Sequence, residues 1–128
     1  MSIKPEHGEV CWNELMTSDT TKAKDFYGKM FGWTSQDLPM KNMTYTMFNK
    51  GEKSIGGLLQ IPSQESGKIP PHWMSYIMVN NLDEMVKKAE VLGAEVKMPI
   101  TAVEGIGRFA VLADPTGAHI ALWQSMTT

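Results

Sequence analysis

The sequence predicts an α+β fold in which two βαβββ modules of one chain form a shared cleft. Its 128 residues are enough for one ordinary globular domain and too few for two independent ones. An apolar pattern with helical spacing occurs twice, each time after one strand-like run and before three more. The two helix starts, Asp19 and Asn81, lie about 62 residues apart, so two copies nearly fill the chain.

The first module is predicted to span about residues 9–61. A strand over 10–16 is followed by Asp19, a residue type that begins helices. The helix is expected to bury one apolar face, formed by Ala23, Phe26, Tyr27, Met30 and Phe31. Gly32 is placed to end the helix in the left-handed conformation. Three short strands complete the module, at 33–38, 45–49 and 54–61.

The second module repeats this plan over about residues 73–124, after a polar linker rich in proline and glycine at 62–72. A strand over 73–79 precedes Asn81, which with Glu84 forms a pair like a capping box. The helix that follows has an apolar stripe and ends at Gly93. Three strands are again expected, at 95–98, 108–113 and 118–124.

Composition excludes several classes of function. The formal net charge is −2 and Arg108 is the single arginine, which argues against binding to DNA or RNA. No apolar run approaches the roughly 20 residues of a membrane helix, and the first residues lack the apolar segment of a signal peptide, so we expect a cytoplasmic protein. Cys11 stands alone, which excludes a disulfide framework and a cysteine-based zinc site.

Strand alternation predicts which side chains line the cleft. Seven are expected there as ligand-binding or neighbouring apolar groups: Trp12, Met16, Met74, Tyr76, Met78, Trp123 and, at the mouth as an anion contact, Arg108. Glu14 is a carboxylate in the middle of an apolar strand, suited to act as a general base or to hold a cation. His119 is its candidate acid/base partner. The alternatives are a solvent-facing or salt-bridged Glu14 and a hydrogen-bonded His119 at a hairpin edge.

Two segments carry a family resemblance: TSDTTKAKDFYGKMFGW after the first strand and GRFAVLADPTGAHIALWQ near the end. Together they resemble the vicinal oxygen chelate superfamily, also called the glyoxalase/bleomycin-resistance/dioxygenase fold, in its glyoxalase-like subgroup. That resemblance implies paired βαβββ modules and, in the enzymes, a divalent metal held by four side chains of the His, Gln and Glu types. The matching positions here are Trp12, Gly57, Met74 and Ala121, none of which supplies such a ligand. We therefore expect no metal and no cofactor.

Three hypotheses about function follow. The first is a protein that binds a small, partly aromatic or apolar molecule in the cleft. The second is a lyase or isomerase, or an oxygenase-like member of the superfamily, with Glu14 as the base on an α-carbonyl substrate. The third is an interaction subunit without a ligand, whose bare sheet faces pack on a second copy in a homodimer. Neither nucleic acid nor membrane is an expected partner.

Overall fold

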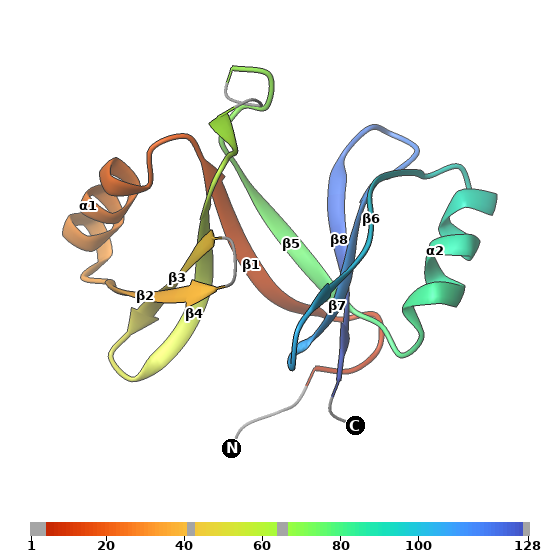
Figure 1. Cartoon of the computed structure of the whole chain (residues 1–128), viewed down its shortest axis with the longest axis horizontal. Coiled ribbons are helices and arrows are strands. Elements are labelled where there is room, and N and C mark those ends of the chain that lie inside the picture. The colour runs from red at the N-terminus through yellow and green to blue at the C-terminus, as the bar shows by residue number, and fades with distance from the viewer. Residues whose placement is uncertain (1–4, 41–42, 64–66, 127–128) are drawn as a thin grey trace. The chain divides into compact units, whose positions relative to one another are not determined.

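The computed structural model describes residues 5–40, 43–63 and 67–126, and the chain divides into two compact units. The first unit comprises residues 12–74, and the second comprises residues 75–128 together with 1–11. Each unit contains one helix and a set of strands (Figure 1). Across the described residues, eight strands and two helices follow the predicted order.

In the first unit, one helix accompanies four strands in the order β2-β3-β4-β1. The elements are β1 (Val10–Thr17), α1 (Thr20–Phe31), β2 (Thr34–Met40), β3 (Met43–Lys50) and β4 (Lys53–Gln60). β1 pairs with β4 in parallel, whereas β2, β3 and β4 form an antiparallel meander. The predicted helix ends are confirmed: the Asp19 carboxylate accepts the Lys22 N–H at 2.9 Å, and Gly32 has a φ of 75°.

The second unit repeats the arrangement, with strand order β5-β8-β7-β6. Its elements are β5 (His72–Met78), of which residues 72–74 fall in the first unit, α2 (Leu82–Val91), β6 (Glu95–Val103), β7 (Gly107–Ala113) and β8 (His119–Ser125). The predicted cap is confirmed, since the Asn81 side chain accepts the Glu84 N–H at 3.2 Å. β6 is longer than predicted because the pairing shifts register between Met98 and Thr101, which lets the strand pass through Pro99.

Each unit buries one sheet face under its own helix. In the first unit the core is Leu15, Phe48 and Leu58, against which Ala23, Tyr27, Trp33 and Ile55 pack. In the second, Val79 and Leu82 form the core with Ala110, Leu112 and Leu122, and Ile77 of β5 packs against it. Leu15, Ile77 and Val79 therefore lie on the helix sides, as alternation predicts. The opposite faces carry Trp12, Glu14 and Met16 in one unit, and Tyr76 and Met78 in the other.

The prediction for the apolar face of α1 was wrong in part. Ala23 and Tyr27 pack against the core, but Phe26 and Met30 are 54% and 63% exposed, and Phe31 is also exposed. Successive helix residues are rotated by about 100°, so Phe26, next to Tyr27 in sequence, points away from the sheet. Phe31 is one turn from Tyr27 and contacts the rings of Tyr27 and Trp33 at the edge of the core. The predicted stripe is thus wider than the area that this sheet covers.

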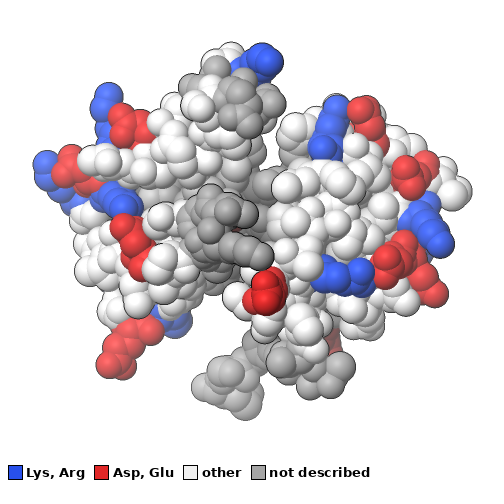
Figure 2. Space-filling model, viewed as in Figure 1, with Lys and Arg blue, Asp and Glu red and all other residues white. Residues whose placement is uncertain are grey.

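Charged side chains of both signs gather over α1 and over α2, the elements that face solvent (Figure 2). On α1 the pair Asp25–Lys29 is spaced i, i+4 at 3.1 Å. Neither sign forms an extended patch of its own in this view. In the part of the chain that the structure describes, no helix has both the length and the apolar character needed to cross a lipid bilayer.

Each unit also ties the start of its helix to the glutamine that closes its last strand. The Gln124 side-chain oxygen accepts the Leu82 N–H at 2.8 Å. In the first unit, the Gln60 amide nitrogen donates to the Ser18 carbonyl at 2.7 Å. The similarity of the segments GGLLQ and IALWQ therefore has a structural counterpart.

Candidate functional site

A chain of three polar side chains lies on the sheet face of the first unit that α1 does not cover. The indole N–H of Trp12 donates to the Tyr45 hydroxyl oxygen at 2.7 Å. The Tyr45 hydroxyl in turn donates to the Glu14 carboxylate. Glu14 is only 2% exposed, so it is a buried acidic group reached through a phenol. We call these three residues the Trp12–Tyr45–Glu14 chain.

Gly57 makes room for this chain. It pairs with Glu14 across β1 and β4, and with Met47 across β3 and β4. A Cβ atom at position 57 would overlap the hydroxyl and the ring carbon of Tyr45 and would lie 3.1 Å from Trp12 Nε1. The glycine is required because another side chain occupies the space over its backbone.

Two of the four positions that the resemblance assigns to metal ligands meet here. They are Trp12 and Gly57, and the Tyr45 hydroxyl lies against both. The Tyr45 hydroxyl, which is hydrogen-bonded to both Trp12 and Glu14, therefore lies beside two of the positions that hold metal ligands in the enzymes of the superfamily. In the described part of the chain, no three His, Cys, Asp or Glu side chains are grouped so that they could hold a metal ion.

The electrostatics keep the Tyr45 proton in place. Burial raises the pKa of the Tyr45 hydroxyl far above its usual value, and the charge of Glu14 and its hydrogen bond raise that pKa further. The N–H that Trp12 donates lowers the pKa, but this effect is smaller than that of burial. Tyr45 thus stays neutral at any physiological pH and donates its proton toward Glu14.

Apolar side chains surround the Trp12–Tyr45–Glu14 chain on this face. Register pairs Met16 with Leu59, Met47 with Gln36, and Tyr45 with Leu38. All but the exposed Gln36 are half-buried. Among the residues that these pairings place on the face, Glu14 carries the one charged side chain. The face therefore combines methionine and leucine side chains with one charged group, the Glu14 carboxylate.

The corresponding face of the second unit carries aromatic and aliphatic side chains at the equivalent positions, without a carboxylate. Tyr76 pairs with Ala121 where Glu14 pairs with Gly57, and Phe109 takes the place of Tyr45. The Tyr76 and Phe109 rings are 6.3 Å apart. Trp123 lies between Met78 and Phe109 in register. The predicted residues Tyr76, Met78 and Trp123 thus share one face, and Phe109, which the prediction missed, joins them.

Gly107 also lies against an aromatic ring. A Cβ atom there would come within 2.5 Å of the Gln124 carbonyl oxygen and 2.6 Å of the Trp123 ring. Gly107 is buried in β7, so it accommodates both the neighbouring backbone and the Trp123 ring.

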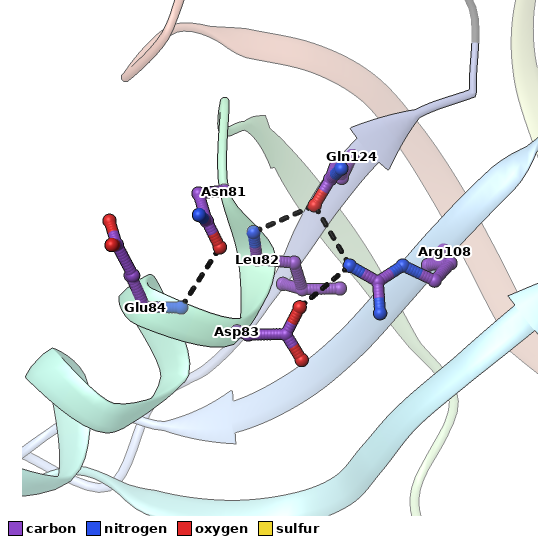
Figure 3. A network of polar contacts seen from close by, with 6 residues as sticks. All are labelled: Asn81, Leu82, Asp83, Glu84, Arg108 and Gln124. Carbon is purple, nitrogen blue, oxygen red and sulfur yellow. Dashed lines mark hydrogen bonds and ion pairs between the residues drawn. The ribbon is translucent and has the colours of Figure 1, made fainter.

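Arg108 lies on the other face of its sheet, under α2. Arg108 pairs in register with Gln124, and its guanidinium donates a hydrogen bond to the side-chain oxygen of Gln124 at 3.1 Å (Figure 3). It also forms an ion pair with Asp83 at 2.9 Å, which lowers the pKa of that carboxyl. Ala110 and Leu112, which share its side of β7, pack in the α2 core. Arg108 therefore joins the first turn of α2 to the sheet, and we do not place it in the ligand site.

The remaining predicted residues are less closely defined. His119 is exposed at the start of β8, opposite Ala113. Met74 is buried and belongs to the first unit. The pairing of Glu14 with His119 stays a prediction. The sequence analysis did not predict Tyr45. The available signal was Gly57, because a glycine inside a strand indicates that another group approaches the backbone closely.

A separate hollow lies at the surface of the first unit, on the outer side of α1. It has a volume of about 410 Å³ and is lined by Lys22, Asp25, Phe26, Lys29 and Met30. All five residues belong to one helix, so no second element encloses a ligand there. This hollow is a depression between exposed side chains, and it does not displace the sheet face as the candidate site.

Comparison with known proteins agrees with the geometry of the fold. The family model described as Glyoxalase/Bleomycin resistance protein/Dioxygenase superfamily matches residues 10–122. The chain therefore belongs to this superfamily, which confirms the resemblance found in its motifs.

Two curated relatives have greater sequence similarity than the structural neighbours. "Putative glyoxylase CFP32" of Mycobacterium tuberculosis is 34% identical over 120 residues, covering 92% of this chain and 46% of its own length. Anthracycline biosynthesis protein DauV of Streptomyces sp. (strain C5) is 32% identical over 129 residues, covering 91% and 47%. The chain thus spans about half the length of the curated relatives that it matches.

Solved structures confirm the fold class. Methylmalonyl-CoA epimerase from Mycobacterium tuberculosis matches with a TM-score of 0.65 and 16% identity over 98% of this chain and 93% of its own. A hypothetical protein, BH1468 from Bacillus halodurans C-125, matches with a TM-score of 0.68 and 15% identity over 96% and 98%. At these identities the likeness concerns the fold alone.

Proposed function

We propose that this protein binds a small molecule with an aromatic or apolar body on the sheet face of the first unit, with the Trp12–Tyr45–Glu14 chain as its polar anchor. The observation that carries the proposal is that Glu14 is buried and accepts a hydrogen bond from Tyr45 on a face that α1 does not cover. Burying a carboxylate costs stability unless its hydrogen bonds are made, so such a group on the sheet face away from α1 favours a binding role.

Two further points support this proposal. The half-buried Met16, Met47 and Leu59 offer a surface that adapts to varied apolar shapes. The name of the relative DauV refers to anthracycline biosynthesis, and anthracyclines have a flat aromatic body. A ligand with such a body and a polar substituent fits the composition of this face.

Isothermal titration calorimetry with 2-naphthol, a flat aromatic alcohol, tests the proposal. We expect saturable binding that weakens by about fivefold in Trp12→Leu, since one aromatic contact contributes about 1 kcal/mol in addition to the burial of apolar area. Trp33→Leu is the matched control, because Trp33 packs on the helix side of the same sheet. Equal affinities in both variants would contradict the assignment of the face.

A second candidate function is that of a lyase or isomerase with Glu14 as the base. The contact that favours it is the Tyr45–Glu14 hydrogen bond, which pairs a buried carboxylate with a neutral proton donor. The base would take the proton from the carbon next to a carbonyl, and solvent would return one to the same carbon. Exchange of the α-protons of 2-hydroxyacetophenone in D₂O, followed by NMR, tests this step.

The substitution Glu14→Gln separates the two candidates. It keeps the shape and an acceptor for Tyr45 but removes the base, so exchange should stop while binding of 2-naphthol stays within about threefold. A melting temperature that rises with protein concentration but does not change when any probe is added would instead favour the interaction subunit.

A further inference from the structure

We infer that the ligand group placed at Tyr45 must be a hydrogen-bond donor, so the site selects alcohols and amines over carboxylates and phosphates. This inference rests on the proposed function and adds the chemical class of the ligand. It follows from how the hydrogen-bonding capacity of the Trp12–Tyr45–Glu14 chain is already used.

A tyrosine hydroxyl has one proton to donate and two lone pairs that accept. The proton of Tyr45 goes to Glu14, and one lone pair accepts the N–H of Trp12 at 2.7 Å. The Trp12 ring has no second N–H to offer. The capacity that remains at the Tyr45 oxygen is one lone pair, which only a donor can satisfy.

The position of Glu14 fixes this direction. To donate toward a ligand, Tyr45 would have to turn its proton away from a carboxylate that is almost fully buried. That carboxylate would then lose a hydrogen bond in a place that water does not reach, which is costly. The raised pKa of Tyr45 is in keeping with a proton held firmly in this direction.

Charge acts in the same sense. None of the residues that register places on this face is a lysine or an arginine. Two lysines of α1 are paired elsewhere, Lys24 with Asp37 at 3.0 Å and Lys29 with Asp25 at 3.1 Å. Among the described residues that register places on this face, no cation offsets the negative charge of Glu14 that an anionic ligand would meet. An ammonium group would gain from the same charge.

Four probes with one aromatic body test the inference: 2-naphthol, 2-naphthylmethylammonium, 2-naphthoate and 2-methylnaphthalene. Their Kd values are measured by calorimetry at neutral pH on the full chain. We expect the alcohol and the ammonium to bind at least about tenfold more tightly than the carboxylate. A carboxylate that binds as tightly as the alcohol overturns the inference and leaves the proposed function standing. Binding of none of the four overturns the proposed function as well.

The variant Tyr45→Phe locates the effect. It removes the acceptor oxygen and keeps the ring, so 2-naphthol should lose about tenfold in affinity and 2-methylnaphthalene less than twofold. Tyr27→Phe is the matched control, because Tyr27 also accepts an indole N–H, from Trp73 at 3.1 Å, on the helix side of the sheet. An equal loss for both probes in Tyr45→Phe would show that the hydroxyl does not select donors. If Tyr45→Phe does not fold, the ranking of the four probes on the unaltered chain decides the matter.

Discussion

The substitution Gly57→Ala tests the central contact of the site. The added methyl group would occupy the space of the Tyr45 hydroxyl, so the phenol ring must swing away from the sheet. The hydrogen bonds from Trp12 to Tyr45 and from Tyr45 to Glu14 are then lost together. A neutral hydrogen bond contributes about 1 kcal/mol and one to a charged group about 2 kcal/mol, so the free energy of unfolding should fall by about 3 kcal/mol.

Unfolding in urea, followed by tryptophan fluorescence and by circular dichroism, measures this loss. Gly56→Ala is the matched control on the other side of the same strand. A Cβ atom at Gly56 would lie 3.1 Å from the Asn13 carbonyl oxygen and would disturb no hydrogen bond between side chains. Gly56→Ala should lower the free energy of unfolding by about 1 kcal/mol, within the usual range of single substitutions.

A double-mutant cycle with Tyr45→Ala decides whether the phenol is the cause. Without the ring, the added methyl group meets only the Trp12 side chain, whose Nε1 atom would lie 3.1 Å away, and the cost of Gly57→Ala should fall below about 1 kcal/mol. The coupling between the two substitutions should therefore reach about 2 kcal/mol. An equal cost of Gly57→Ala in both backgrounds, or a cost no larger than that of Gly56→Ala, would refute the reasoning.

Three further predictions concern caps and ionisation. Asn81→Ala should lower the free energy of unfolding by about 1 kcal/mol in urea, because it removes the cap of α2, while Asn80→Ala just outside the helix should cost little. Since the pKa of Tyr45 is raised by folding, its contribution to stability is complete below the ordinary tyrosine pKa of about 10 and is lost as pH rises beyond it. Alkaline unfolding curves should show this loss, and Tyr45→Phe should remove it. The Arg108 hydrogen bond lowers the pKa of Asp83, so its contribution is present above about pH 4 and is lost as pH falls further; Arg108→Met should flatten that acid limb in urea midpoints.

Local rules were sufficient to predict the elements of the fold. Asp19, Gly32 and Asn81 have chemistry that acts within three or four residues, so their positions mark helix ends without knowledge of tertiary contacts. Strand β6 went beyond its predicted end because the register shift that accommodates Pro99 arises from pairing with β7. Such a shift depends on a partner strand and leaves no local pattern.

The candidate site was predictable only in part, for the same reason. Alternation along one strand placed Trp12 and Glu14 on a common face, on the side away from Leu15. Tyr45 reaches them from β3, which is 33 residues from Trp12 in sequence, and its position depends on the sheet order. Arg108 was predicted to contact an anion because of its charge and its neighbouring glycines. Its partners are instead Gln124 and Asp83, because its side chain lies on the side of β7 that faces α2.

The glutamines near the ends of β4 and β8 have opposite hydrogen-bonding roles in the two halves. At position 124 the helix start is held by a side-chain oxygen, and a glutamate there would keep that acceptor and add a favourable charge for the helix dipole and Arg108. At position 60 the amide nitrogen of the glutamine donates to the Ser18 carbonyl, and a glutamate there would place a carboxylate oxygen next to that carbonyl oxygen with no proton between them. The two glutamines thus tolerate different substitutions, so a change cannot be transferred from one half to the other by their alignment.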